Sequence, residues 1–225
     1  MPAILKGKTV ARTGDGIDVY LRALLSGELS MADYFFVQSM RGNQYYIGSA
    51  DVSTPTTWTA VAVNTVTTPA LFVAVPANKV LIPVHIELYY EAFGTDAQME
   101  CQAVSGTGGS RTSGGTAITP VNMRTDLSDS SGLTCYAGGG SIVTVGQTGN
   151  INVFWRDGRQ FAVTKTASSA TVSSGDTNKF VWDAVASNTF VMCGPTAQLQ
   201  VNQGSQAGTG FVKLIAVVIP STDLP

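Results

Sequence analysis

Hydrophobic and polar residues alternate along much of this chain from Trp58 onward, and the alternation is clearest in VLIPVHIELYYE, residues 80–91. One side of this run carries Val80, Ile82, Val84, Ile86, Leu88 and Tyr90, and the other carries Leu81, Pro83, His85, Glu87, Tyr89 and Glu91. Because successive side chains of a strand point to opposite faces, the pattern predicts a half-buried strand. Pro83 lacks the N–H that a sheet hydrogen bond needs, so we expect a sheet edge or a bulge there.

A second alternating run, AQMECQAV, occupies residues 97–104. It places Met99, Cys101 and Ala103 on one side, and Gln98, Glu100 and Gln102 on the other. The turn-forming stretch FGTDA separates the two runs. We therefore expect the two runs to pair as an antiparallel hairpin.

Shorter runs of the same kind continue to the C-terminus, and turn-forming residues such as Gly, Pro, Asn and Asp separate them. They are TWTAVAV (57–63), ALFVAVP (70–76), NINVFW (150–155), QFAVTK (160–165), KFVWDAV (179–185), TFVMC (189–193), AQLQV (197–201) and FVKLIAVVI (211–219). About eight to ten short strands without helical patterns between them predict an all-β fold, an antiparallel β-sandwich or jelly roll. The last run is apolar on both faces, so we expect it at the centre of a sheet.

Residues 1–56 have a different pattern, and we expect them to form an N-terminal arm or small anchoring subdomain beside a jelly-roll domain of residues 57–225. Alternation over Ile17–Leu25 is typical of a strand. The run SMADYFFVQSM is compatible with a short helix that has Ser30 as its N-cap and Asp33 in its first turn. The segment is too poor in apolar residues for a core of its own, so we expect it to lie on the main domain or on a neighbouring subunit.

Composition narrows the possible functions. The 225-residue chain has 12% charged residues and a net charge of −2. The basic residues are scattered, which argues against direct binding of nucleic acid. No secretory signal or membrane-spanning run is recognisable, so we expect folding in a cytoplasm and no membrane contact. The three cysteines are widely spaced, which favours buried thiols over a Cys101–Cys135 disulfide.

The patterns that would indicate catalysis or a cofactor are incomplete. Gly7-Lys8-Thr9 resembles the end of a P-loop but lacks its first glycine, and the glycines of Gly106–Gly115 do not complete a dinucleotide-binding fingerprint. A single histidine excludes multi-histidine metal sites. Glu87 and Glu91 would lie ~13 Å apart on one strand, which is too far for a glycosidase pair. We expect no catalytic, cofactor or metal site.

Several stretches of the chain resemble bacteriophage virion proteins of jelly-roll type. They are LRALLSGELSMADYF (21–35), VPANKVLIPVHIELYYEAFGTDAQMECQ (75–102), SGGTAITPVNMRTDLSDSSG (113–132) and GFVKLIAVVIP (210–220). The third is similar to a Gly-Gly-Thr…Thr-Pro-x-Asn-x-Arg element of small phage structural proteins. The resemblance implies a capsid decoration (cement) protein, a head fibre or a tail component, commonly a homotrimer.

We therefore expect a non-enzymatic decoration protein on the outer surface of a virion, assembled in the host cytoplasm, that binds the major capsid protein and other virion subunits and bridges neighbouring capsid subunits. The long connection Ser105–Gly132 is expected to be a contact loop. The candidate interface residues are Arg22, Tyr34, Arg41, Arg111, Arg124, Asp126 and Asp129.

Two alternatives stay open at this point. One is a spike, head-fibre or tail module that binds a host receptor or glycan through exposed aromatic residues. Trp58, Trp155 and Trp182 could supply such a platform, although aromatic residues on strands are more typical of a core. The other is a glycan-cleaving enzyme of sandwich fold, which the lack of a close acid pair disfavours.

Overall fold

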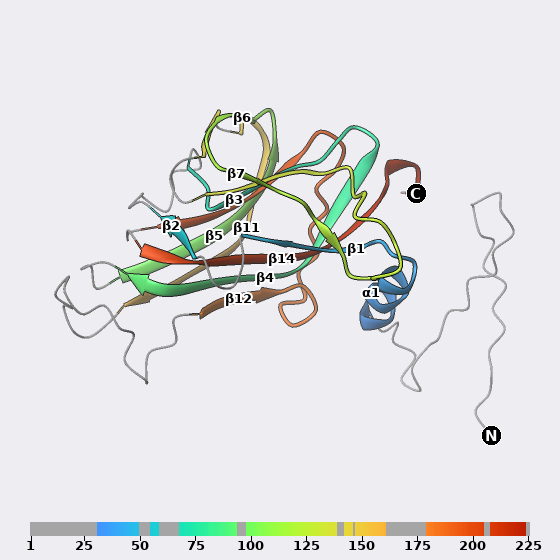
Figure 1. The fold of residues 1–225 in the computed structure, drawn as a ribbon, viewed down its shortest axis with the longest axis horizontal. Helices are drawn as coiled ribbons and strands as arrows, with labels where there is room; N and C mark the ends of the chain where they lie inside the picture. Colours follow the sequence, from blue (N-terminus) through green and yellow to red (C-terminus); the bar gives the residue numbers. More distant parts are fainter. Residues whose placement is uncertain are drawn as a thin grey trace, which may run out of the picture.

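The alternating runs form the strands of two antiparallel sheets that pack face to face (Figure 1). This computed structural model describes residues 31–49, 55–58, 68–93, 98–138, 142–145, 147–160, 179–204 and 208–223. Strands predominate within these ranges, so the prediction of an all-β antiparallel sandwich is confirmed. The strands predicted over Ile17–Leu25 and residues 161–165, and most of that predicted over 57–63, lie outside the described residues.

The first sheet is built around two long neighbouring strands, β4 (Lys79–Phe93) and β14 (Gly208–Pro220). Its order is β12 (Lys179–Asp183), β4, β14, β1 (Gln44–Gly48) and β8 (Val121–Asn122), and β2 (Thr56–Trp58) pairs with the start of β14. The run predicted to be central is therefore central, because β14 has a neighbour on each side.

The second sheet faces the first across the core. Its order is β11 (Gly149–Gln160), β5 (Gln98–Thr107), β13 (Gln198–Gly204), β3 (Leu71–Ala74), β9 (Thr134–Ala137) and β7 (Thr116–Ile118). A separate two-stranded sheet joins β6 (Ser110–Ser113) to β10 (Val143–Val145). The helical elements are α1 (Met31–Met40) and the short 3₁₀ turn η1 (Ser221–Asp223).

The order of the main strands follows a simple rule. By main strands we mean all strands except β2 and β6–β10, and in chain order they are β1, β3, β4, β5, β11, β12, β13 and β14. One sheet holds the first, eighth, third and sixth of them, and the other holds the second, seventh, fourth and fifth. Most successive strands therefore lie in opposite sheets, so that the chain repeatedly crosses from one layer to the other.

The core lies between the inward faces of the two sheets. Ile47 of β1, Leu214 of β14, Ile86 of β4 and Trp182 of β12 are register partners in one row across the first sheet. All of them are buried. The facing residues of the second sheet include Met99, Cys101, Ala103, Leu199 and Val201, which are also buried.

Strand β4 contains a β-bulge beside Pro83. The register against β14 passes from His85 to Pro83 and skips Val84. After the bulge, the side chains that face the core are Ile86, Leu88 and Tyr90, as the alternation predicts. The prediction at Pro83 was an edge or a bulge, and the structure has the bulge. β4 is not an edge strand, because it lies between β12 and β14.

Two predictions about the strands were wrong, one of pairing and one of a strand's existence. β4 and β5 do not form a hairpin, because β5 pairs with β11 and β13 in the opposite sheet. The run TFVMC does not form a strand, and Cys193 alone makes an isolated bridge, to Leu81. Alternation identifies the buried face of a strand, but it does not identify the strand that pairs with it. In TFVMC the side chains of Phe190 and Met192 point outward and are exposed.

The connection Ser105–Gly132 also has more regular structure than expected of a loop. Its first residues complete β5, and β6, β7 and β8 follow within it. Of the segment 1–56, residues 44–48 form β1, which hydrogen-bonds to β14 over its whole length and so belongs to the first sheet.

Candidate interaction surface

Helix α1 ends in a fully hydrogen-bonded cap. The Gly42 N–H donates to the Ser39 carbonyl at 3.0 Å, and the Asn43 N–H donates to the Gln38 carbonyl at 2.9 Å. Gly42 has φ 75°, the left-handed conformation that a cap of this kind requires and that glycine adopts without strain. The side chains of Asn43 and Gln38 add a hydrogen bond of 2.8 Å. The cap directs the chain from α1 straight into β1.

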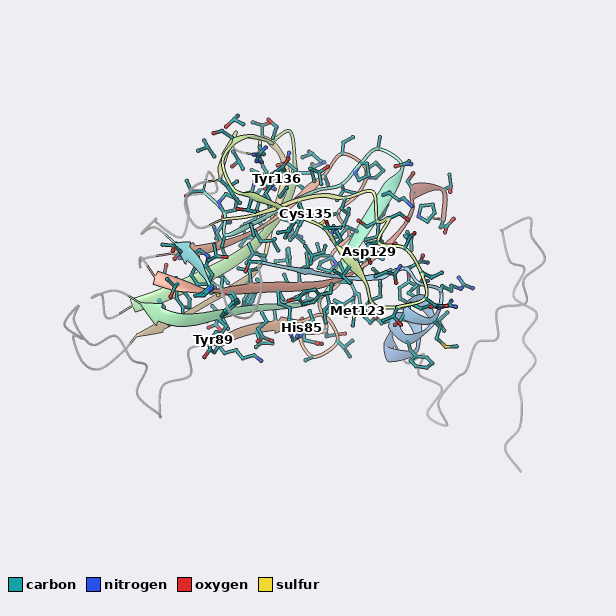
Figure 2. All side chains as sticks on the ribbon, viewed as in Figure 1. His85, Tyr89, Met123, Asp129, Cys135 and Tyr136 are labelled. Atoms are coloured by element: carbon teal, nitrogen blue, oxygen red, sulfur yellow. The ribbon has the colours of Figure 1, made fainter. Side chains whose placement is uncertain are left out.

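The loop after β8 is fastened to this cap. The Asn122 side-chain amide donates to the Gly42 carbonyl at 2.9 Å, and the Met123 N–H donates to the Gln44 carbonyl, also at 2.9 Å. Asp129 closes the loop, because its carboxylate accepts from the Asn122 N–H at 2.6 Å. Segments about 80 residues apart in sequence thus form one surface (Figure 2).

Arg124 joins the same two segments. Its guanidinium donates to both carboxylate oxygens of Asp126, at 2.8 and 2.7 Å, and to the Met40 carbonyl at the end of α1, at 2.7 Å. A cation at a helix C-terminus also interacts favourably with the helix dipole. The hydrogen bond from Arg124 holds the pKa of Asp126 below its ordinary value. The two charges therefore neutralise each other and hold the loop against the helix.

On the other side of α1 lies the loop that follows β12. The Phe35 ring stacks on the Phe190 ring with centroids 6.1 Å apart. Asp183 orders the start of this loop, since its carboxylate accepts from the N–H groups of Val185 and Ala186 at 2.9 and 3.0 Å. The helix is thus placed between the loops that follow β8 and β12, the strands at the two ends of the first sheet.

These three segments expose large apolar side chains, and we call nine of them the end surface. Its members are Tyr34, Phe36, Val37 and Met40 of α1, Val121, Met123 and Leu127 of β8 and its following loop, and Phe190 and Met192 of the loop after β12. Their exposed fractions lie between 41% and 66%. Contiguous exposed apolar groups of this kind mark interaction sites.

Most of the predicted interface residues meet at the end surface. Tyr34 and Arg41 belong to α1 and its cap, and Arg124, Asp126 and Asp129 belong to the loop fastened to them. Burial raises the pKa of Tyr34, with a smaller opposing effect of Arg41 and a supporting one of Asp223. Arg22 lies outside the described residues.

Arg111 lies away from the end surface, and its guanidinium already makes contacts within the chain. Its guanidinium carbon lies 3.6 Å from the centroid of the Tyr136 ring on β9, and its Nε donates to the Gly114 carbonyl at 2.7 Å. Figure 2 shows Tyr136 beneath the β6 region, away from α1. Arg111 therefore holds the β6–β10 sheet over the outer face of β9, and it is not part of the end surface.

The outer face of the first sheet carries a charge cluster around Glu87. Lys179 and Lys213 approach its carboxylate at 2.9 and 3.7 Å, and the His85 Nε2 lies 3.5 Å away. Partial burial acts to raise the pKa of Glu87, but the two lysines outweigh it and hold that pKa below its ordinary value. Among the described residues, no three His, Cys, Asp or Glu side chains gather to form a metal site.

Aromatic residues divide between core and surface. Trp58, Trp155 and Trp182 are buried, as their strand positions favour, so they form no exposed platform. Tyr90 is buried, whereas Tyr89 points outward and lies beside Phe211 with ring centroids 6.3 Å apart. In the part of the chain that the structure describes, no helix is long and apolar enough to cross a membrane.

The cysteines are free and buried, as predicted. Burial raises the pKa of the Cys135 thiol and of the Cys193 thiol to about 12. Since the thiolate is the reactive form, we expect no cysteine to react with Ellman's reagent at pH 8 in the folded protein, and all three to react in guanidinium chloride. A thiol that reacts within minutes before unfolding would contradict this placement.

The sequence patterns did not identify several members of the end surface, namely Phe36, Val37, Met40, Met123, Leu127, Phe190 and Met192. One signal for them was available in MADYFFVQSM, which forms a helix with apolar residues on every side. A helix of that kind is normally covered all round.

Comparison with known proteins adds no relative from which a role could be taken. No protein-family model, no curated protein and no solved structure matches this chain.

Proposed function

We propose that this chain is a non-enzymatic structural protein of a virion, of the capsid-decoration type, that binds the outer shell and bridges neighbouring shell subunits. The observation that carries the proposal is the order of the main strands, first-eighth-third-sixth in one sheet and second-seventh-fourth-fifth in the other. This order supports a jelly roll, the double Greek key that recurs in viral capsid proteins and also in lectins and cupins.

The chemistry of the described surface fits a building block better than an enzyme. The predicted interface residues Arg124 and Asp126 form an ion pair with each other, and Lys179 and Lys213 pair with Glu87. These charges are therefore already paired within the chain. Paired charges and an uncharged polar surface suit packed interfaces, where an isolated charge would be costly to desolvate. The end surface supplies the exposed apolar area that protein contacts use.

The proposal is tested with undecorated shells assembled from the major capsid protein of the same virus. We expect the full chain to cosediment with these shells and to saturate at a fixed ratio to the shell subunit. Removing residues 1–30, which leaves α1 and every described strand in place, should weaken this binding at least tenfold. Equal binding by the truncated chain would remove the anchoring role of the N-terminal segment, and no saturable binding by the full chain would reject the decoration role.

A second candidate is a spike, head-fibre or tail module that binds a glycan or receptor. The half-buried pair Tyr89 and Phe211 on the outer face of the first sheet, beside Glu87 and Lys213, supports it, because an aromatic face next to polar groups suits a sugar ring. The copy number in purified particles separates the candidates. Decoration requires many copies over the whole shell, whereas a spike or tail module is present in few.

A further inference from the structure

We propose that the end surface is a homotypic interface, at which α1 of one copy of this chain packs against the end surface of a second copy. This inference does not depend on the virion role, because it concerns how the purified chain associates with itself. It assigns an occupant to the exposed side of α1.

The first argument is the two-sided character of α1. Phe35 and Gln38 are buried against the sandwich, with Phe35 stacked on Phe190. Phe36 and Met40, one turn apart on the other side, are 66% and 61% exposed. Side chains four residues apart on a helix are neighbours, so these two form one apolar ridge. Within the described part of the chain, the sandwich therefore covers only half of α1, although a helix that is apolar on every side is normally buried on both sides.

The second argument is size and composition. The end surface combines aromatic residues and three methionines, which are the types enriched in the centres of protein interfaces. Its nine side chains come from three segments and are each 41% to 66% exposed. One partner in a standard interface contributes ~800 Å² from about 20–30 residues, so a patch of this kind can form the apolar centre of such an interface.

The third argument is charge. In a symmetric contact the same patch meets itself, so uncompensated like charges would repel. At the end surface Arg124 is neutralised by Asp126, and Arg41 and Asp223, which carry opposite charges, both lie near enough to Tyr34 to act on its pKa. Such a surface can meet an identical copy without repulsion, and it offers no excess of charge to a strongly acidic or basic partner.

The fourth argument is that the other common route of self-association is obstructed. Strand addition needs a long, regular sheet edge. The outermost described strands β8 and β7 have 2 and 3 residues, and β12 has 5 and begins with Lys179. β11 is longer, but two register shifts interrupt its pairing with β5. The end surface is therefore the better site for contact between copies.

The test is the mass of the purified full chain by sedimentation velocity across a range of concentrations. We expect a discrete oligomer of the 23.5 kDa chain, and at least a tenfold weaker self-association for the double variant Phe36→Ser, Met40→Ser. The matched control is Ile151→Ser, Val153→Ser on β11, where the side chains are 53% and 51% exposed. This control should associate as the parent does.

Circular dichroism and thermal unfolding of each variant show whether it is folded, which is expected because all four side chains point outward. If the folded chain is a monomer up to about 100 μM, the proposal is overturned, and the end surface then serves a different partner. An oligomer that survives the α1 substitutions, or that is lost equally with the β11 substitutions, also overturns it. Shell binding is measured separately, so either proposal can fail while the other holds.

Discussion

Replacing Leu214 with alanine is expected to lower the free energy of unfolding by about 3–5 kcal/mol, a large part of the total for a typical domain. Leu214 lies in the middle strand of the first sheet, with Ile47 and Ile86 as its register partners. All three side chains are fully buried. Partners fixed on both sides by sheet hydrogen bonds cannot close the space that the missing side chain leaves, so the cavity persists.

The measurement is the midpoint of denaturant unfolding at one fixed protein concentration, because self-association would make stability depend on concentration. The matched control is Val181→Ala on the outer face of β12, where the side chain is 42% exposed and lies outside the end surface. It should cost less than about 1 kcal/mol. Equal losses at the two positions would show that Leu214 does not occupy a tightly packed site.

Replacing Gly210 with alanine is expected to lower the free energy of unfolding by about 2–3 kcal/mol or more. Gly210 lies beside a register shift between β14 and β4. An added Cβ would overlap the Tyr89 carbonyl oxygen and would lie 2.5 Å from the Trp58 ring. A backbone atom of a central strand cannot move aside without breaking the β4–β14 pairing, so the strain is not relieved.

Gly194→Ala is the control for this change, because no atom lies within 4 Å of the position that its Cβ would take. It should leave thermal stability unchanged or raise it slightly, by up to about 1 kcal/mol, through the lower entropy of the unfolded chain. If Gly210→Ala melts at the parental temperature, the close packing of β14 against Tyr89 and Trp58 is incorrect.

The sequence predicted well what depends on neighbouring residues. The alternation in β4 identified Ile86, Leu88 and Tyr90 as inward-facing, and that in β5 did so for Met99 and Cys101. Every second side chain of a strand points to the same face, so which residues share the buried face follows from local strand geometry. Pro83 likewise predicted an edge or a bulge, and the structure has a bulge there. This prediction needed no other part of the chain, because the missing N–H is a property of proline itself.

Pairing between strands was not predictable in this way. β4 and β5 are adjacent in sequence and alternate equally well, yet they lie in opposite sheets. Both arrangements bury the same faces, so the choice depends on the simultaneous fit of all strands around one core. The strand prediction for TFVMC was wrong for a related reason. Phe190 and Met192 are exposed as members of the end surface and do not belong to the core.

The candidate site shows the same division. The sequence by itself determined the residue types, namely a charged loop rich in turn-forming residues and a helix that is apolar on all sides. Only the tertiary structure decided that Arg124 reaches the Met40 carbonyl at 2.7 Å, whereas Arg111 stacks on Tyr136 in another part of the molecule. Composition and periodicity act over a few residues, but contact across about 80 residues depends on the packing of both sheets, which no local pattern specifies.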